Sequence, residues 1–265
     1  MKKILGIALS LIMVVMLLTA CGKKEDVDEE NHKTKTAKND IITSENKTSN
    51  SSSDEIHNTT STINGVKVNW EYTIRDGSNL IQELKCTNPQ ELVGDIKIPS
   101  TLDGKKVFSI GQHAFSGADR MTGATIPDSV YFIRGKAFAS TGLKTIDLPV
   151  SLKELGDEAF VHCYSLEEVL IPDTCNCIID QDAFYFCINL KKIVIPDSVD
   201  SIGYYTRYTA GSDIEKLEKK RLDSQGTADS VFYGCHPDLT IYCYENSIAA
   251  QYAARYNIKY EYLKK

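Results

Sequence analysis

The sequence lacks the short motifs that mark common catalytic sites. It contains no Gly-x-Ser-x-Gly elbow, no Gly-Lys-Ser/Thr phosphate loop and no His-Glu-x-x-His zinc motif. Three of its five histidines, His113, His162 and His236, lie in separate segments of the chain. We therefore expect a protein that is not an enzyme, with no catalytic residues, no bound metal and no cofactor.

An excess of basic residues is also missing. The chain has 30 Lys and Arg against 36 Asp and Glu, which gives a formal net charge of −6. An acidic surface repels phosphate backbones, and this argues against nucleic acid as a partner.

Long apolar runs are absent except at the N-terminus. Lys2 and Lys3 precede an apolar run from Ile4 to Leu18, which is shorter than the roughly 20 residues that span a bilayer. This pattern predicts a signal peptide over residues 1–20. The following Leu-Thr-Ala-Cys-Gly, ending in Cys21 and Gly22, resembles the lipobox of bacterial lipoproteins.

In that family the signal peptide is cut before the Cys, whose thiol then carries a diacylglyceryl group. The resemblance implies lipidation of Cys21 and two-chain anchoring to an extracytoplasmic membrane surface. The alternative is an ordinary cleavage site with an incidental Cys.

Residues 21–62 have few apolar side chains. They are rich in Lys, Glu, Asp, Asn, Ser and Thr, so they bury too little surface to offset their chain entropy. We expect a disordered tether with an r.m.s. span of about 35 Å.

A short unit recurs through the rest of the chain. Its Ala-Phe step, or the Val-Phe of the last copy, ends at Phe115, Phe138, Phe160, Phe184 and Phe232. The first four copies are 22 to 24 residues apart and the last follows after 48, twice the unit. A period in the low twenties is typical of a solenoid, and we expect the five rings to form one buried stack.

Within each unit a short strand precedes a proline. The segments 143–149, 166–172 and 190–196 share the pattern Leu-x-x-apolar-x-apolar-Pro, whose last apolar residues alternate as in a half-buried strand. With the turn and the Ile/Leu-Gly-x-x-Ala-Phe-x-x-Cys step, the unit resembles the BspA-type leucine-rich repeat of bacterial surface proteins.

The resemblance implies an α/β fold: a BspA-like leucine-rich-repeat solenoid with short parallel strands over residues 93–245. Some family members are implicated in adhesion to host matrix proteins or to other bacteria. Such a fold implies binding through a surface made by stacked repeats, although a fold does not fix a function.

Two segments should cap the solenoid. Residues 63–92 alternate like a β-hairpin, with Trp70 or Tyr72 packing on the first repeat. Residues 246–265 predict a helix N-capped by Ser247 and then a last strand.

The repeat is interrupted once, by an insertion over residues 204–228. Insertions leave a solenoid as loops on one face, often the binding face. Its tyrosines, Tyr204, Tyr205 and Tyr208, are candidate contacts with a partner; a solvated excursion without a role is the alternative.

Seven cysteines follow Cys21. Cys163, Cys187 and Cys235 occupy one repeat position, three residues after Phe, where a small buried residue is expected. Cys175 and Cys243 also fall on core positions, and Cys86 lies in the N-terminal hairpin. Cys177 lies where its repeat has one extra residue and is expected to be exposed. Metal binding by Cys175 and Cys177 is weakly supported because no second pair stands at zinc-site spacing.

The outward face of the predicted strands is the main candidate binding surface. Leu170, Val194 and Tyr242 form an apolar stripe there, which either contacts a protein partner or is covered by Ile214 and Leu217 of the insertion. The other residues expected on this face are Gly123, Thr125, Thr145, Asp147, Glu168, Lys192 and Thr240.

These observations favour a cell-surface lipoprotein that binds a protein of the extracellular matrix or of another cell. A solute-binding lipoprotein of a transport system is the first alternative, although such proteins usually have two lobes. An envelope-associated hydrolase is the second.

Overall fold

The computed structural model describes residues 55–75, 77–203 and 231–264. They all belong to one compact unit, Asn50–Lys265. The predicted signal peptide, Cys21 and the tether up to residue 54 lie outside the described residues, as does the predicted insertion.

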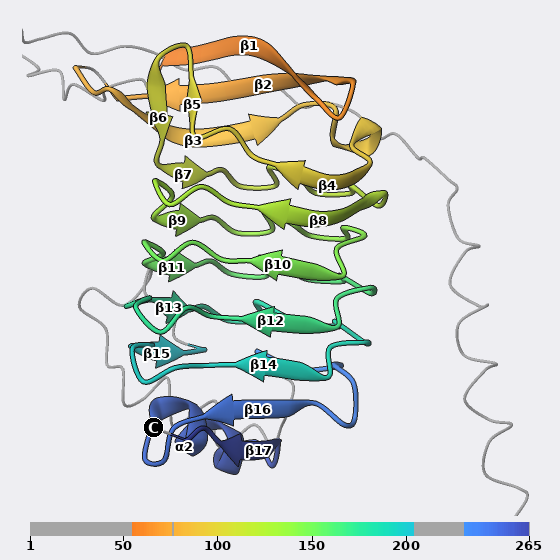
Figure 1. Ribbon diagram of the computed structural model, residues 1–265, viewed down its shortest axis with the longest axis vertical. Coiled ribbons are helices and arrows are strands. Elements are labelled where there is room, and N and C mark those ends of the chain that lie inside the picture. The colour runs from red at the N-terminus through yellow and green to blue at the C-terminus, as the bar shows by residue number, and fades with distance from the viewer. Residues whose placement is uncertain (1–54, 76, 204–230, 265) are drawn as a thin grey trace, which may run out of the picture. The chain divides into compact units, whose positions relative to one another are not determined.

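The described part is a solenoid in which each repeat adds one short strand to each of two sheets (Figure 1). The second sheet has the strand order β17-β16-β14-β12-β10-β8-β4. All its repeat strands except the last, β16, precede a proline, and neighbouring repeat strands pair in parallel. They are β4 (Gly94–Lys97), β8 (Met121–Thr125), β10 (Thr145–Asp147), β12 (Glu168–Leu170), β14 (Lys192–Val194) and β16 (Thr240–Cys243).

The first sheet runs along the other side of each coil. Its repeat strands are only two residues long and also pair in parallel. They are β7 (Ser109–Ile110), β9 (Phe132–Ile133), β11 (Glu154–Leu155), β13 (Ile178–Ile179) and β15 (Ser201–Ile202). This arrangement confirms the predicted leucine-rich-repeat solenoid with short parallel strands.

The Phe stack forms the centre of the core. Phe115, Phe138, Phe160 and Phe184 are fully buried, and Phe232 is 5% exposed. Successive ring centroids are 5.1, 5.3, 5.4 and 5.5 Å apart, with planes within 8° of parallel. One ring per coil therefore fills the space between the two sheets, as the spacing predicted.

The residue before each Phe is small because the coils touch there. The Phe115 N–H donates to the Ala137 carbonyl of the next coil, and this bond recurs from Phe138 to Ala159 and from Phe160 to Ala183 at 2.7 to 2.8 Å. The backbone also turns through positive φ just before each Ala, at His113, Lys136, Glu158 and Asp182. A larger side chain would hold these backbones apart.

The cysteines after Phe form a second ladder. The Sγ atoms of Cys163, Cys187 and Cys235 donate to the carbonyl oxygens of Phe138, Phe160 and Phe184, at 3.0 to 3.2 Å. Each thiol is thus a small donor that links one coil to the previous one.

The expectation of an exposed Cys177 is wrong. The side chain is 1% exposed, and so is within the core beside Cys175. The extra residue in this repeat is accommodated by a tight turn, in which the Cys177 N–H donates to the Cys175 carbonyl at 3.0 Å.

The N-terminal cap is larger than the sequence suggested. Residues 55–62 were expected in the tether, but β1 (Glu55–Ile63) pairs antiparallel with β2 (Val66–Ile74) along nine residues. The polar composition of β1 concealed its alternation, and the two-residue Asn64-Gly65 turn, with φ of 51° and 78°, is a hairpin signal that was overlooked.

β2 also pairs antiparallel with β3 (Leu80–Cys86), which completes the predicted hairpin. The Trp70 ring lies edge-on to Phe115 at 6.0 Å and covers the first rung of the Phe stack. A short hairpin of β5 (Thr101–Leu102) and β6 (Lys105–Val107) lies against β3, and a 3-10 turn, η1 (Pro89–Glu91), leads into β4.

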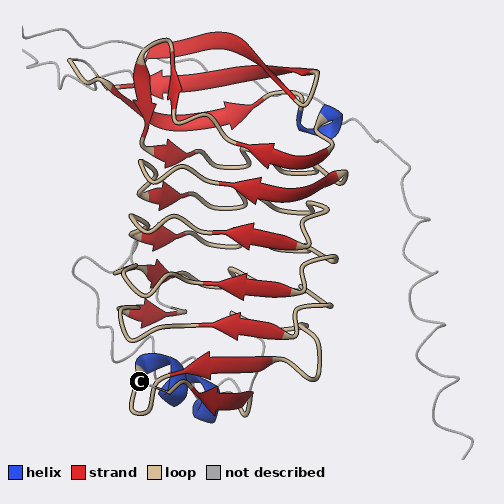
Figure 2. Ribbon diagram, in the orientation of Figure 1, coloured by secondary structure: helices blue, strands red, loops and turns tan. Residues whose placement is uncertain are grey.

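The C-terminal cap has the predicted helix and strand. Ser247 accepts a hydrogen bond from the Ala250 N–H and begins α2 (Ile248–Arg255). Tyr252 of α2 covers the last ring of the stack, Phe232, edge-on at 6.0 Å. β17 (Lys259–Tyr262) then joins the second sheet beside β16. In the described residues, helix occurs only at the two ends of the solenoid (Figure 2).

No helix in the described residues is long and apolar enough to cross a membrane.

Candidate functional site

The parallel register brings the predicted strand-face residues into two rows. In the first row Thr145, Glu168, Lys192 and Thr240 lie side by side on successive strands. In the second row Asp147, Leu170, Val194 and Tyr242 do the same. Residues that are 23 to 48 positions apart in sequence are therefore neighbours on one surface, which we call the strand face.

The second row contains the apolar stripe. Leu170 is 48% exposed, and Val194 and Tyr242 are half-buried beside it. An exposed Asp147 lies at one end of the stripe, and an exposed Glu261 lies beside Tyr242 at the other. The surface is an apolar strip between two carboxylates.

Glu261 belongs to β17, whose place on this face was not predicted. β17 adds Lys259 to the first row and Glu261 to the second. The final strand was expected as a cap, but a pattern of alternating residues does not say which sheet a strand joins. The parallel pairing with β16 supplies that information.

The Lys192 ammonium lies close to the stripe. Lys192 Nζ is 2.6 Å from Glu168 Oε1 and 5.7 Å from the centroid of the Tyr242 ring. The hydrogen bond to Glu168 raises the pKa of Lys192. Glu168 offsets this charge, and Lys259 in the same way offsets the charge of Glu261, with Nζ and Oε1 3.2 Å apart.

Two of the residues expected on the strand face are buried. Thr240 is 5% exposed between its register neighbours Lys192 and Lys259, so it offers a partner little surface. Gly123 is covered by the side chain of Asp95, which also accepts a hydrogen bond from Thr122 Oγ1 at 3.0 Å. The accessible strand face consequently begins at Thr125.

The three insertion tyrosines, Tyr204, Tyr205 and Tyr208, lie outside the described residues, as do Ile214 and Leu217. Their part in binding stays a prediction.

A second surface was missed in the sequence. Rings gather on the turns that follow the Phe stack: His162, Tyr185, Phe186 and Tyr233 have centroids 4.7 to 6.2 Å apart, and Tyr164 is 51% exposed beside them. We call these five residues the aromatic edge.

The aromatic edge could have been found by comparing repeats. The position two after Phe holds Gly117 and Ser140 in the first two copies, but His162 and Phe186 in the next two. All four have positive φ, a conformation that costs a residue with a side chain roughly 1–2 kcal/mol. Large rings at these positions therefore oppose the local backbone preference.

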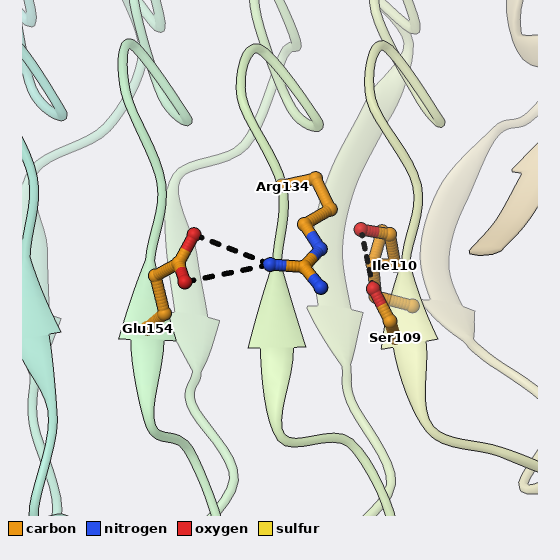
Figure 3. Close-up of polar contacts among 4 residues, drawn as sticks. All are labelled: Ser109, Ile110, Arg134 and Glu154. Atoms are coloured by element: carbon orange, nitrogen blue, oxygen red, sulfur yellow. Dashed lines mark hydrogen bonds and ion pairs between the residues drawn. The ribbon is translucent and has the colours of Figure 1, made fainter. Parts of the chain in front are cut away.

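The polar contacts of the first sheet are structural. Arg134 Nη1 lies 3.3 and 3.4 Å from the two carboxylate oxygens of Glu154 (Figure 3). The guanidinium carbon of Arg134 also lies 4.3 Å from the centroid of the Phe132 ring. On the coil next to that of Arg134, Ser109 Oγ donates to the carbonyl of the adjacent residue, Ile110, at 3.4 Å (Figure 3). The Ser109 hydroxyl thus donates to a backbone carbonyl and not to a side-chain base, and Glu154 accepts from Arg134.

Acidic, histidine and cysteine side chains form no cluster of metal-binding type in the described part of the chain. Burial raises the pKa of Cys86 to about 11 and that of Cys235 to about 12, so these thiols stay protonated at neutral pH. Protonated, enclosed thiols are poor nucleophiles and poor metal ligands.

Comparison with known families agrees with this geometry. The family model described as BspA type leucine-rich repeat region matches residues 93–210 in six copies. The fold is a BspA-like leucine-rich-repeat solenoid. Structurally the array continues past residue 210, since Phe232 and β16 form a further rung.

Three solved structures resemble the chain. A leucine-rich cell surface protein of Faecalibacterium prausnitzii is 24% identical over 65% of this chain and 42% of its own, with a TM-score of 0.43. A leucine-rich repeat protein of Bacteroides ovatus is 24% identical over 66% and 45%, with a TM-score of 0.44. The pneumococcal vaccine antigen PcpA is 22% identical over 55% and 46%, with a TM-score of 0.41.

This chain therefore aligns with less than half of each of these three proteins. Comparison with curated proteins finds no match.

Proposed function

We propose that the chain is a surface lipoprotein, anchored through Cys21, whose repeat domain binds a protein through the strand face. The partner would belong to the extracellular matrix or to another cell. The observation that carries the proposal is the stripe of Leu170, Val194 and Tyr242, which is the accessible apolar row of an otherwise polar face.

The position of this stripe supports a binding role. These side chains point away from a core that the Phe stack already fills, so they add little to the packing of the coils. Leu170, Val194 and Tyr242 lie on adjacent strands and so form a contiguous apolar patch, and such patches often mark protein–protein contacts. Tyr242 offers both an apolar ring and a hydroxyl, as residues at the centre of interfaces often do.

The charges around the stripe indicate which partner would fit. Asp147 at one end would attract a Lys or Arg that lies beside an apolar centre of the partner, whereas Glu261 at the other end is already paired with Lys259. The overall charge of −6 has the same sign and would help to bring a basic partner to the domain.

The predicted tether would place this rigid surface away from the membrane. A flexible chain of the length of residues 21–62 would span about 35 Å. β1 takes up the last eight of these residues, so the part of the chain left as a tether is shorter and its span is smaller. The binding surface needs no cofactor, since it acts by shape, apolar contact and charge.

The test uses the full chain as bait for extracellular matrix proteins and bacterial surface proteins. The double variant Val194→Glu with Tyr242→Glu should lose a captured partner while the melting temperature stays unchanged. A variant at the aromatic edge, Tyr164→Ala, is the matched control and should retain that partner. Loss of binding only in the control would assign the site to the aromatic edge instead.

The same experiment distinguishes the alternative in which the insertion covers the stripe. If residues 204–228 cover Val194 and Tyr242, the double variant should lower the melting temperature, and deletion of 204–228 should increase capture. If the wild-type chain captures no protein, the proposed function fails.

A further inference from the structure

The outer edge of β1 is an unpaired strand edge at the N-terminal end of the first sheet. Among the described residues, β1 pairs with β2 alone and ends the strand order of that sheet (Figure 1). Its nine residues pair with β2 without a break in register. This leaves a nine-residue edge in continuous register at the end of the solenoid, along a strand that curves (Figure 1).

The hairpin geometry shows which backbone groups face outward. Asn64 and Gly65 both have positive φ, as in a type I′ two-residue turn, so the flanking pair Ile63 and Val66 is hydrogen-bonded. Hydrogen-bonded pairs alternate in an antiparallel ladder. The N–H and C=O groups that point away from β2 are therefore those of Ile56, Asn58, Thr60 and Thr62.

β1 has none of the features that usually protect an edge strand. Such edges carry Lys, Pro or a bulge that prevents further pairing. β1 reads Glu-Ile-His-Asn-Thr-Thr-Ser-Thr-Ile and contains none of these. By contrast β17, which ends the second sheet, carries Lys259 and Glu261 and is fully exposed.

We infer that β1 pairs antiparallel with β1 of a second copy of this chain, with a twofold axis at Thr59. This inference is independent of the proposed function. In this register the outward groups of Ile56 face those of Thr62, and those of Asn58 face those of Thr60. Within β1 no like charges face each other, because Glu55 is its only formally charged residue and lies opposite Ile63. At the axis, Thr59 Oγ1 donates to Asp103 Oδ1 of its own chain at 3.2 Å, and Tyr72 also donates to this carboxylate, at 2.8 Å.

A buried atom without a hydrogen bond favours this register. His57 Nε2 is buried and has no hydrogen-bond partner among the described residues, since Glu55 Oε2 is 3.8 Å away. The ring is held by stacking on Tyr72, with centroids 5.2 Å apart. In the dimer His57 lies opposite Ser61 of the second copy, in the type of pair where side chains approach most closely.

The Ser61 hydroxyl can donate a hydrogen bond. Its Oγ accepts a hydrogen bond from Trp70 Nε1 at 2.8 Å, which leaves the hydroxyl hydrogen available as a donor. Neutral His57 has an acceptor nitrogen. The twofold pairing would thus place the Ser61 hydroxyl of each copy beside His57 Nε2 of the other copy, so that two such contacts form per dimer.

Disulfide trapping in the full chain tests the pairing. Across the axis, Thr59 faces its own copy in a pair whose Cα atoms are about 4.5 Å apart, within the range that a disulfide bridges. Thr59→Cys should therefore give a covalent dimer on a non-reducing gel after mild oxidation with diamide. The wild-type chain and Thr62→Cys, whose sulfurs would be about 20 Å apart, should not.

A charge swap then tests the register without disturbing the fold. In the Thr59→Cys background, Asn58→Lys with Thr60→Lys places like charges opposite each other across the axis and should lower the yield of dimer at least tenfold. Asn58→Lys with Thr60→Glu places opposite charges there and should restore it. The melting temperatures of the two variants should be similar, because both side chains lie on the exposed side of β1.

Sedimentation equilibrium of the wild-type chain provides the direct readout. A dimer that Thr60→Pro converts to a monomer is expected, since the Thr60 N–H faces outward and is not needed for pairing with β2. A wild-type chain that sediments as a monomer, or a Thr59→Cys chain that forms no covalent dimer, overturns the inference.

Discussion

Lys192 and Glu168 form the shortest ion pair of the strand face, with Nζ and Oε1 2.6 Å apart on adjacent strands. Both side chains are more than one-third exposed, so water and salt screen their attraction. The pair therefore shapes the charge of the surface more than it stabilises the coil. Lys192→Met should change the free energy of unfolding by less than about 1 kcal/mol, measured by urea denaturation.

The same substitution should affect binding. Glu168 would no longer be offset by a cation, so the stripe would be more negative, and a basic partner should associate faster at low salt. The measurement is the association rate constant in two salt concentrations. An association rate unaffected by the substitution and by salt would contradict the charge complementarity assigned to the strand face.

Arg134 and Glu154 provide a more buried ion pair for comparison. Their side chains are 24% and 15% exposed, and the Arg134 guanidinium also lies over the Phe132 ring. A double-mutant cycle with Arg134→Met and Glu154→Gln should give a coupling of about 1 kcal/mol. The equivalent cycle for Lys192 and Glu168 should give a smaller value. Equal couplings would show that burial does not distinguish the two pairs.

Gly142 is required by a close approach of two coils. A Cβ at this position would overlap the Asp119 carbonyl oxygen, which is backbone and cannot rotate away. Gly142→Ala should destabilise the protein by more than about 2 kcal/mol, in the range of overpacked sites. The control is Gly123→Ala, whose Cβ would meet the side chain of Asp95. That side chain can turn aside, so the control should lose less stability in the same urea titration.

Alkaline pH should destabilise the fold through its buried thiols. Burial raises the pKa of Cys86 from 9.0 to about 11 and that of Cys235 from 9.0 to about 12. Above pH 9 and up to these raised pKa values, the thiols of the unfolded chain release protons that the same thiols keep in the folded chain. The free energy of unfolding therefore falls as pH rises through this interval. Urea midpoints should be constant below pH 9 and should decrease from pH 9 towards 12.

The substitution Cys235→Ala provides the control for this pH dependence. It removes one of the titrating groups and should make the decrease shallower than in the wild-type chain. A stability that is constant or increases over this interval would be inconsistent with protonated thiols in the fold.

The sequence predicted those parts of the fold that depend on the repeat. The Phe positions indicated one ring per coil, and the strands before each proline indicated a parallel ladder whose rows follow from the repeat spacing alone. Capping signals were equally informative at Ser247, where a side chain that accepts a backbone hydrogen bond begins α2.

The remaining features depend on contacts that no repeat pattern encodes. β1 was missed because its Thr, Ser and Asn residues resemble those of a tether, and only pairing with β2 makes them a strand. The prediction that Thr240 is exposed was wrong, because the sequence did not show that β17 places Lys259 beside Thr240, opposite Lys192 on β14. The aromatic edge was overlooked because its rings occupy positions where the first repeats have small residues.

The central claim is that the coils stack in register around the Phe rings, and the substitution Phe160→Ala tests it most directly. Phe160 is fully buried between Phe138 and Phe184, at 5.3 and 5.4 Å. Urea denaturation should show a loss of about 3–5 kcal/mol, whereas Tyr164→Ala, four residues later and half exposed, should lose less than about 1 kcal/mol. Similar small losses in both variants would contradict a Phe-centred solenoid.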